Sequence, residues 1–85
     1  MPVISRFYGI VVFINYNDHD PPHFHARYQE QEVIVDIQTG VVTGTMSRQA
    51  LQCCSMGFGL HREELMENWN RARDRRALVP IAPLP

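Results

Sequence analysis

The fold is decided by the stretch HFHARYQEQEVIVDIQ, which occupies residues 23–38. Its two halves, residues 23–29 and 32–38, each alternate between apolar and polar side chains. This is the period of a β-strand that buries one face. Because the halves are nearly adjacent, they predict an antiparallel hairpin with a two-residue loop at Glu30 and Gln31.

The register of this hairpin follows from apolar cross-strand pairs on the buried face. A loop at Glu30 and Gln31 pairs three sets of apolar residues, namely Phe24 with Ile37, Ala26 with Val35 and Tyr28 with Val33. The same register places His25 opposite Asp36. The loop lacks the Asn-Gly or glycine preference of tight hairpins, so a bulge could shift the pairing.

Segments on both sides complete a small sheet. Residues 7–16 are rich in β-branched and aromatic side chains and predict a strand flanked on both faces. Residues 15–22 are dense in turn formers and end in Pro-Pro, which predicts a shaped loop. Residues 41–46 predict a short fourth strand.

The C-terminal half predicts a helix and a tail. Ser47 is a good N-cap, and an apolar stripe with helical spacing continues from there to Ala72. Its phase survives Gly57 and Gly59, which favours one long kinked helix over two unrelated ones. Residues 77–85 are uncharged and proline-rich, so we expect them to lie extended against the fold or against a partner.

These elements predict an α+β fold in a single domain of residues 1–85: an antiparallel sheet of about four strands packed on one face by a long or kinked C-terminal helix. A chain of 85 residues has a small core, so a protein partner or homo-oligomer is expected. A net charge of -1 argues against a protein whose main task is to bind nucleic acid through its charge. No apolar run is long enough for export or membrane insertion, and we expect a cytoplasmic protein with free thiols at Cys53 and Cys54.

Three of the four histidines fall within seven positions, at His19, His23 and His25. The last two project from one strand face and can converge on a single ion. His19 could bend back as a third ligand, with Asp18, Asp20 or Asp36 as oxygen donor or supporting group. This interpretation predicts a divalent metal such as zinc.

Two other interpretations of the same residues stay open. A metal-independent ribonuclease would use His23, His25 and Arg27 as its catalytic groups, with Asp36 orienting a ring. Alternatively, the short polar side chains satisfy the backbone of the loop, and the paired histidines belong to a docking surface.

Further candidate binding residues lie on the predicted helix. His61 sits on the apolar stripe, where a core histidine with one satisfied nitrogen is favoured over a remote ligand. All eight basic residues are arginines, and four of them crowd the helix end, at Arg71, Arg73, Arg75 and Arg76. Such a run is typical of the solvent-exposed last turn of a helix, but it could also bind an acidic partner or RNA.

Several motifs span nearly the whole chain. They are ISRF at residues 4–7 with GI at 9–10, NDH at 17–19 with PPHFHA at 21–26, LHREEL at 60–65 with NW at 68–69, and Ile81 with Pro83 and Leu84. Together they resemble the bacterial domain of unknown function 4160 family. That resemblance implies a small stand-alone protein, often encoded beside another small protein in a manner similar to toxin-antitoxin pairs.

The function expected from residues and resemblance together is a small protein-binding or regulatory module that works with a partner. The His-rich loop and the arginine-rich helix end would be its contact surfaces. The alternative is an enzyme, either a ribonuclease-like toxin or a small metal enzyme, that uses the face carrying His23, His25 and Arg27.

Overall fold

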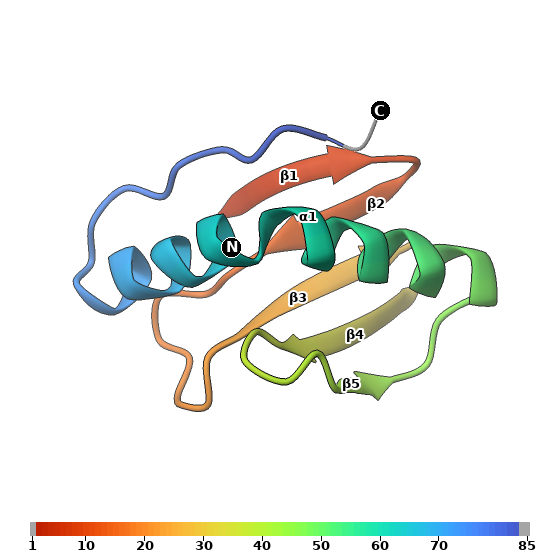
Figure 1. Ribbon diagram of the computed structural model, residues 1–85, viewed down its shortest axis with the longest axis horizontal. Coiled ribbons are helices and arrows are strands. Elements are labelled where there is room, and N and C mark those ends of the chain that lie inside the picture. The colour runs from red at the N-terminus through yellow and green to blue at the C-terminus, as the bar shows by residue number, and fades with distance from the viewer. Residues whose placement is uncertain (1, 84–85) are drawn as a thin grey trace.

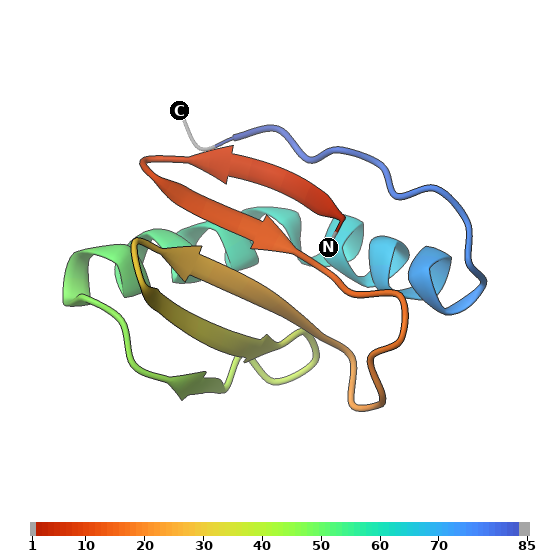
Figure 2. The same cartoon turned by 180° about the vertical axis from the view of Figure 1, so that it is seen from behind.

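The computed structural model describes residues 2–83 and shows a single antiparallel sheet with one helix across it (Figure 1). In chain order the elements are β1 (Val3–Phe7), β2 (Ile10–Phe13), β3 (His23–Tyr28), β4 (Gln31–Asp36), β5 (Val42–Gly44) and α1 (Arg48–Arg73). Each strand pairs with the next, so the sheet order is β1-β2-β3-β4-β5. Figure 2 shows the sheet from the face opposite α1. The predicted α+β class is confirmed.

The sheet has five strands where the sequence predicted about four. The single strand expected over residues 7–16 is wrong, because the chain reverses at Tyr8 and Gly9 between β1 and β2. These two residues have φ of 50° and 79°. Positive φ at both central positions is typical of a tight hairpin turn with the right twist. The turn falls inside the apolar run of residues 7–14. Because the run shows no polar break at the turn, its pattern predicted a single strand.

The predicted hairpin of β3 and β4 exists, but its register is shifted. Gln29 and Glu30 form the turn, so Tyr28 pairs with Gln31. Gln29 adopts a φ of 56°, which allows the chain to reverse one residue earlier than predicted. A turn displaced by one residue shifts the partner strand by two, and a shift of two leaves every side chain on its predicted face.

This shift changes which polar residues face each other. The prediction that His25 lies opposite Asp36 is wrong, because Asp36 pairs with His23 and His25 pairs with Ile34. The buried face still carries apolar pairs, since Phe24 now lies opposite Val35.

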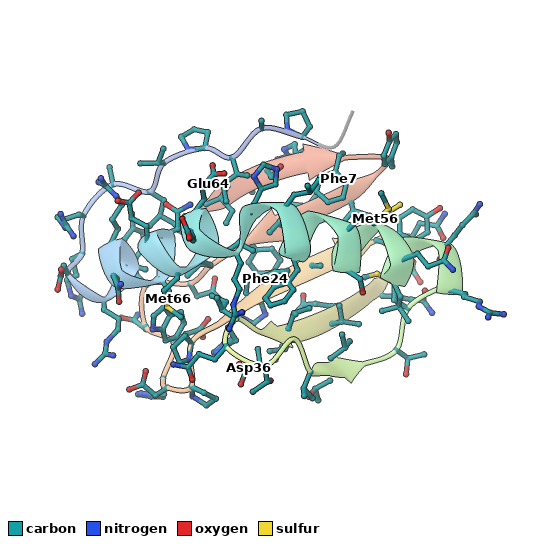
Figure 3. All side chains as sticks on the ribbon, viewed as in Figure 1. Phe7, Phe24, Asp36, Met56, Glu64 and Met66 are labelled. Carbon is teal, nitrogen blue, oxygen red and sulfur yellow. The ribbon has the colours of Figure 1, made fainter. Side chains whose placement is uncertain are left out.

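The core lies between the sheet and α1, and Phe24 points into this layer under the helix (Figure 3). Its largest fully buried apolar side chains come from both layers: Trp69, Phe24, Ile10, Ile14, Ile37 and Val33. Trp69 is 1% exposed, so it anchors the C-terminal half of the helix on the sheet.

The helix is one continuous element with a kink, as predicted. It passes through Gly57 and Gly59, and its non-helical residue is His61, with φ of -124° and ψ of 25°. Ser47 caps its N-terminus by accepting a hydrogen bond from the backbone N–H of Ala50. Gly57 is buried where the helix passes close to the ring of Phe7.

The tail packs on the fold over its described part, as predicted. Ile81 is buried, and its N–H donates to the carbonyl of Ile4 at 2.7 Å. The buried amide of Asn68 bonds both the carbonyl and the N–H of Val79, at 2.9 and 2.8 Å. The last two residues of the predicted tail lie outside the described part of the chain.

Both cysteines are free thiols, in agreement with the sequence prediction. Burial raises the pKa of the Cys54 thiol to about 11, so it stays protonated and unreactive at neutral pH. Within residues 2–83, no helix has the length and apolarity needed to cross a membrane.

Candidate metal centre

Asp18, His23 and His25 bring three ligand atoms together next to the loop that precedes β3. Oδ2 of Asp18 lies 3.2 Å from Nε2 of His23 and 2.9 Å from Nε2 of His25. The three ligand atoms all lie within 4.8 Å of one another. The side chains of Asp18, His23 and His25 are 22%, 14% and 9% exposed, so the cluster is largely shielded but still reached by solvent.

Apolar neighbours hold both rings in place. The two histidines stand two residues apart on β3, so their side chains leave the same face. The ring of His25 stacks on Phe13 of β2, with centroids 4.8 Å apart and an interplanar angle of 9°. The ring of His23 packs against Trp69 of α1 at 5.1 Å.

The far nitrogen of each ring faces an oxygen that can only accept. Nδ1 of His23 lies 2.8 Å from the carbonyl oxygen of Pro21, and Nδ1 of His25 lies 3.3 Å from Oε2 of Glu32. The hydrogen bond from Arg27 holds the pKa of the Glu32 carboxyl below its ordinary value, so this group is charged at neutral pH. A neutral ring that donates through Nδ1 to these oxygens has a lone pair at Nε2.

With both rings in that form, three electron-pair donors converge. Protons on the ring nitrogens or a metal ion can balance such a group. Metal-bound histidines commonly donate their second nitrogen to a carboxylate or a backbone carbonyl, and both partners are present here. Two imidazoles and one carboxylate suit zinc and the neighbouring divalent transition metals.

Glu32 links this cluster to Arg27. Its Oε1 accepts a hydrogen bond from Nη2 of Arg27 at 2.8 Å, while Oε2 faces His25. The guanidinium of Arg27 also lies over the ring of Phe13, at 5.7 Å from its centroid. Arg27 therefore shares the face of the predicted catalytic residues His23 and His25, but its charge is directed at Glu32.

Sequence reasoning missed Glu32. In the predicted register it lay opposite Gln29, whereas in the structure it lies opposite Arg27. The missing information is the position of the turn. The available signal was charge, since opposite charges on facing strands favour the observed pairing.

Two other predicted site residues lie outside the cluster. His19 is exposed and is not part of the metal-ligand group. The carboxylate of Asp36 accepts hydrogen bonds from the backbone N–H groups of Gln38 and Thr39, at 2.7 and 2.9 Å. These bonds, chiefly the one from Thr39, lower the pKa of Asp36, and they give it a role in holding the turn after β4.

His61 is likewise separate from the metal-ligand group. Its half-buried ring points Nδ1 at Oε1 of Glu64, 2.7 Å away, which gives it the one satisfied nitrogen expected from the sequence. It also lines a small apolar cavity beneath the helix, together with Phe24 and Ile81.

The arginine-rich helix end lies against the His-rich loop, a contact that no sequence pattern predicted (Figure 1). Nη1 of Arg73 lies 3.2 Å from Oδ1 of Asp20, and Nη2 of Arg75 donates to Oδ1 of Asn17 at 3.5 Å. Arg71 instead faces its own helix and the tail: it lies 3.9 Å from Glu67 and donates to a tail carbonyl.

Fold and site together define a small α+β protein with a histidine and carboxylate cluster at the start of its central strand. Residues 9–70 match the family described as Domain of unknown function (DUF4160), and the chain belongs to that family. The matched region includes Asp18, both clustered histidines and Glu32. Comparison with curated proteins and with solved structures found no significant match.

Proposed function

We propose that this protein binds one divalent transition-metal ion through Oδ2 of Asp18 and Nε2 of His23 and His25. One observation carries the proposal: both Nδ1 atoms are directed at acceptors, the carbonyl of Pro21 and the carboxylate of Glu32. Rings that donate through Nδ1 to these acceptors direct two lone pairs toward a third ligand atom.

Three protein ligands support a reactive rather than a purely structural metal. Structural zinc sites are almost always closed by four protein ligands, whereas catalytic sites keep one position for water or substrate. A metal bound here would lower the pKa of such a water toward neutrality. The metal-dependent form of the enzyme hypothesis is favoured over the metal-independent one, because Glu32 already engages Arg27.

Calorimetric titration of the metal-stripped protein with Zn²⁺ tests the proposal. We expect one ion per chain, and at least a hundredfold weaker binding after His23→Ala or His25→Ala. His19→Ala is the matched control, because that ring is exposed and lies outside the cluster. Circular dichroism of each variant separates loss of a ligand from loss of the fold.

Wild-type protein without stoichiometric zinc would contradict the proposal. An effect of His19→Ala as large as that of His23→Ala would instead restore His19 as a ligand, as the sequence first predicted.

We also propose, as a second function, that a protein partner adds to the sheet at β5. The edge at β1 receives a hydrogen bond from the tail, whereas no further strand pairs with β5 within residues 2–83. Apolar side chains are exposed on and beside this strand, with Val41 62% and Val42 38% exposed, and Ile34 of the neighbouring β4 38% exposed. Uncovered strand edges with apolar side chains are sites of strand addition.

Light scattering after size exclusion tests whether a second copy is that partner. We expect a dimer, and a monomer after Val42→Lys, because a lysine on an edge strand opposes pairing. A wild-type protein that stays monomeric at high concentration would argue against self-association through β5.

A further inference from the structure

The loop before β3 and the end of α1 enclose a surface depression beside the proposed metal. Its walls are formed by Tyr16, Asn17, Asp18, His19, Asp20 and Arg73. Asp18 belongs both to this depression and to the metal-ligand group. A ligand seated in the depression would therefore lie next to the metal.

We propose that this depression binds a phosphate ester, with one phosphate oxygen on the metal and another at the guanidinium of Arg73. The inference rests on the proposed metal site. Arginine presents a planar set of donors that matches the oxygens of a phosphate group. Arg73 is the arginine whose side chain lines the same depression as Asp18.

The guanidinium of Arg73 is available to an incoming anion. Its pair with Asp20 is exposed on both sides, since the side chains of Arg73 and Asp20 are 56% and 59% exposed. Ion pairs in such exposed positions contribute little to stability, so the guanidinium can turn toward a ligand at small cost.

The charge balance makes phosphate binding depend on the metal. Without a metal, the carboxylates of Asp18 and Asp20 offset the positive charge of Arg73. A divalent ion held by Asp18 would outweigh that carboxylate and leave the depression positive. Anions should therefore bind the metal-loaded protein and not the metal-free one.

The remaining walls suit the organic part of an ester. The hydroxyl of Tyr16 donates to the carbonyl of Arg76 at 3.0 Å. This bond holds the Tyr16 side chain in place where it lines the depression. Aromatic side chains beside a positive groove stack on the bases of nucleotides and single strands. His19 adds a second ring to the same wall.

Calorimetry on zinc-loaded protein tests the inference with three probes: inorganic phosphate, adenosine monophosphate and a short single-stranded oligoribonucleotide. We expect phosphate to bind at least tenfold more tightly to zinc-loaded than to metal-free protein. Tighter binding of the mononucleotide would identify a nucleotide as the source of the phosphate. Tighter, salt-dependent binding of the oligonucleotide would identify RNA.

Three variants separate the role of Arg73 from structural effects. Arg73→Ala should weaken phosphate binding at least tenfold and leave zinc affinity unchanged. Asp20→Asn removes the ion pair but keeps the guanidinium, so phosphate binding should persist or tighten. Arg48→Ala changes an exposed arginine at the opposite end of α1 and should have no effect.

The possible failures are distinguishable. If zinc binds but none of the three probes does, or if Arg73→Ala leaves phosphate binding intact, the inference is overturned and the metal site stands. If zinc itself does not bind, the proposed metal function fails, and this inference fails with it.

Discussion

Glu32 has two neighbours that give its carboxylate two different tasks. One oxygen accepts from Arg27, and the other faces Nδ1 of His25. The first contact keeps the carboxylate charged, and the second fixes the ring of a proposed ligand. Glu32 is therefore a positioning residue for the metal centre and not one of its ligands.

Glu32→Gln should weaken zinc binding by roughly tenfold to a hundredfold, the usual effect of losing a supporting carboxylate. A glutamine carries no charge to favour the Nδ1–H form of His25. Calorimetric titration measures the change, and Glu30→Gln in the adjacent turn is the matched control because Glu30 is exposed. Equal zinc affinities for wild type and Glu32→Gln would rule out this role.

At the scale of residues, the sequence predicted the paired histidines on one face of a strand, and the structure agrees. It also offered Asp18 among several possible oxygen donors. It could not select Asp18 over Asp20 or Asp36, because that choice depends on how the loop folds over β3. The period of a strand carries no information about the path of a loop.

Among the elements, strand β5 depends on a glycine in a special conformation. Gly44 has a φ of +114°, and a Cβ placed there would lie 2.8 Å from the carbonyl oxygen of Glu32. The strand can therefore approach β4 at this point only without a side chain. The glycines of α1 differ, since a Cβ at Gly59 meets nothing within 4 Å.

Two alanine substitutions should therefore have opposite signs. Gly44→Ala should lower the free energy of unfolding by roughly 1–3 kcal/mol, through backbone strain and the close contact. Gly59→Ala should raise it by about 1 kcal/mol, because alanine favours the helix. Urea denaturation of both variants measures these changes. A stabilised Gly44→Ala protein would show that β5 does not need this conformation.

The strands also show where sequence reasoning succeeds and fails. Faces were predicted correctly because alternation survives a shift of two residues. The turn at Tyr8 was not predicted, and the turn at Gln29 was predicted one residue too late. Both residues adopt positive φ, which is uncommon for tyrosine and glutamine. The helix was predicted through its glycines because the apolar stripe continues in phase beyond them.

The molecule as a whole is one sheet with a single helix on one face, and two carboxylates of strand β4, Glu32 and Asp36, link its stability to pH. Glu32 and Asp36 both have a pKa below their ordinary values of 4.5 and 3.8, because hydrogen bonds favour their charged forms. A carboxyl whose pKa is lower in the folded state stabilises the fold above its ordinary pKa. That stability is lost as the pH falls through the folded-state pKa.

The free energy of unfolding should therefore fall as the pH drops below about 5, as the linkage of carboxylates to folding requires. Urea denaturation across this range measures the loss. Solvent reaches both groups, so the loss contributed by each should be small. Asp36→Asn should make the free energy of unfolding depend less on pH in this acid range. An unchanged dependence in that variant would contradict the stabilising role of the Asp36 carboxylate.

The proposed ligands of the metal centre, and the groups that bond to them, come from a short stretch of chain. Asp18, Pro21, the two histidines, Arg27 and Glu32 all lie within residues 18–32. All of α1 and the tail lie further along the chain, and Trp69 of the helix packs against the ring of His23. During synthesis the full ligand set therefore leaves the ribosome before the helix that covers the sheet. An ion that binds this segment early would also stabilise chains whose helix has not yet docked, so it should speed folding as well as raise the final stability.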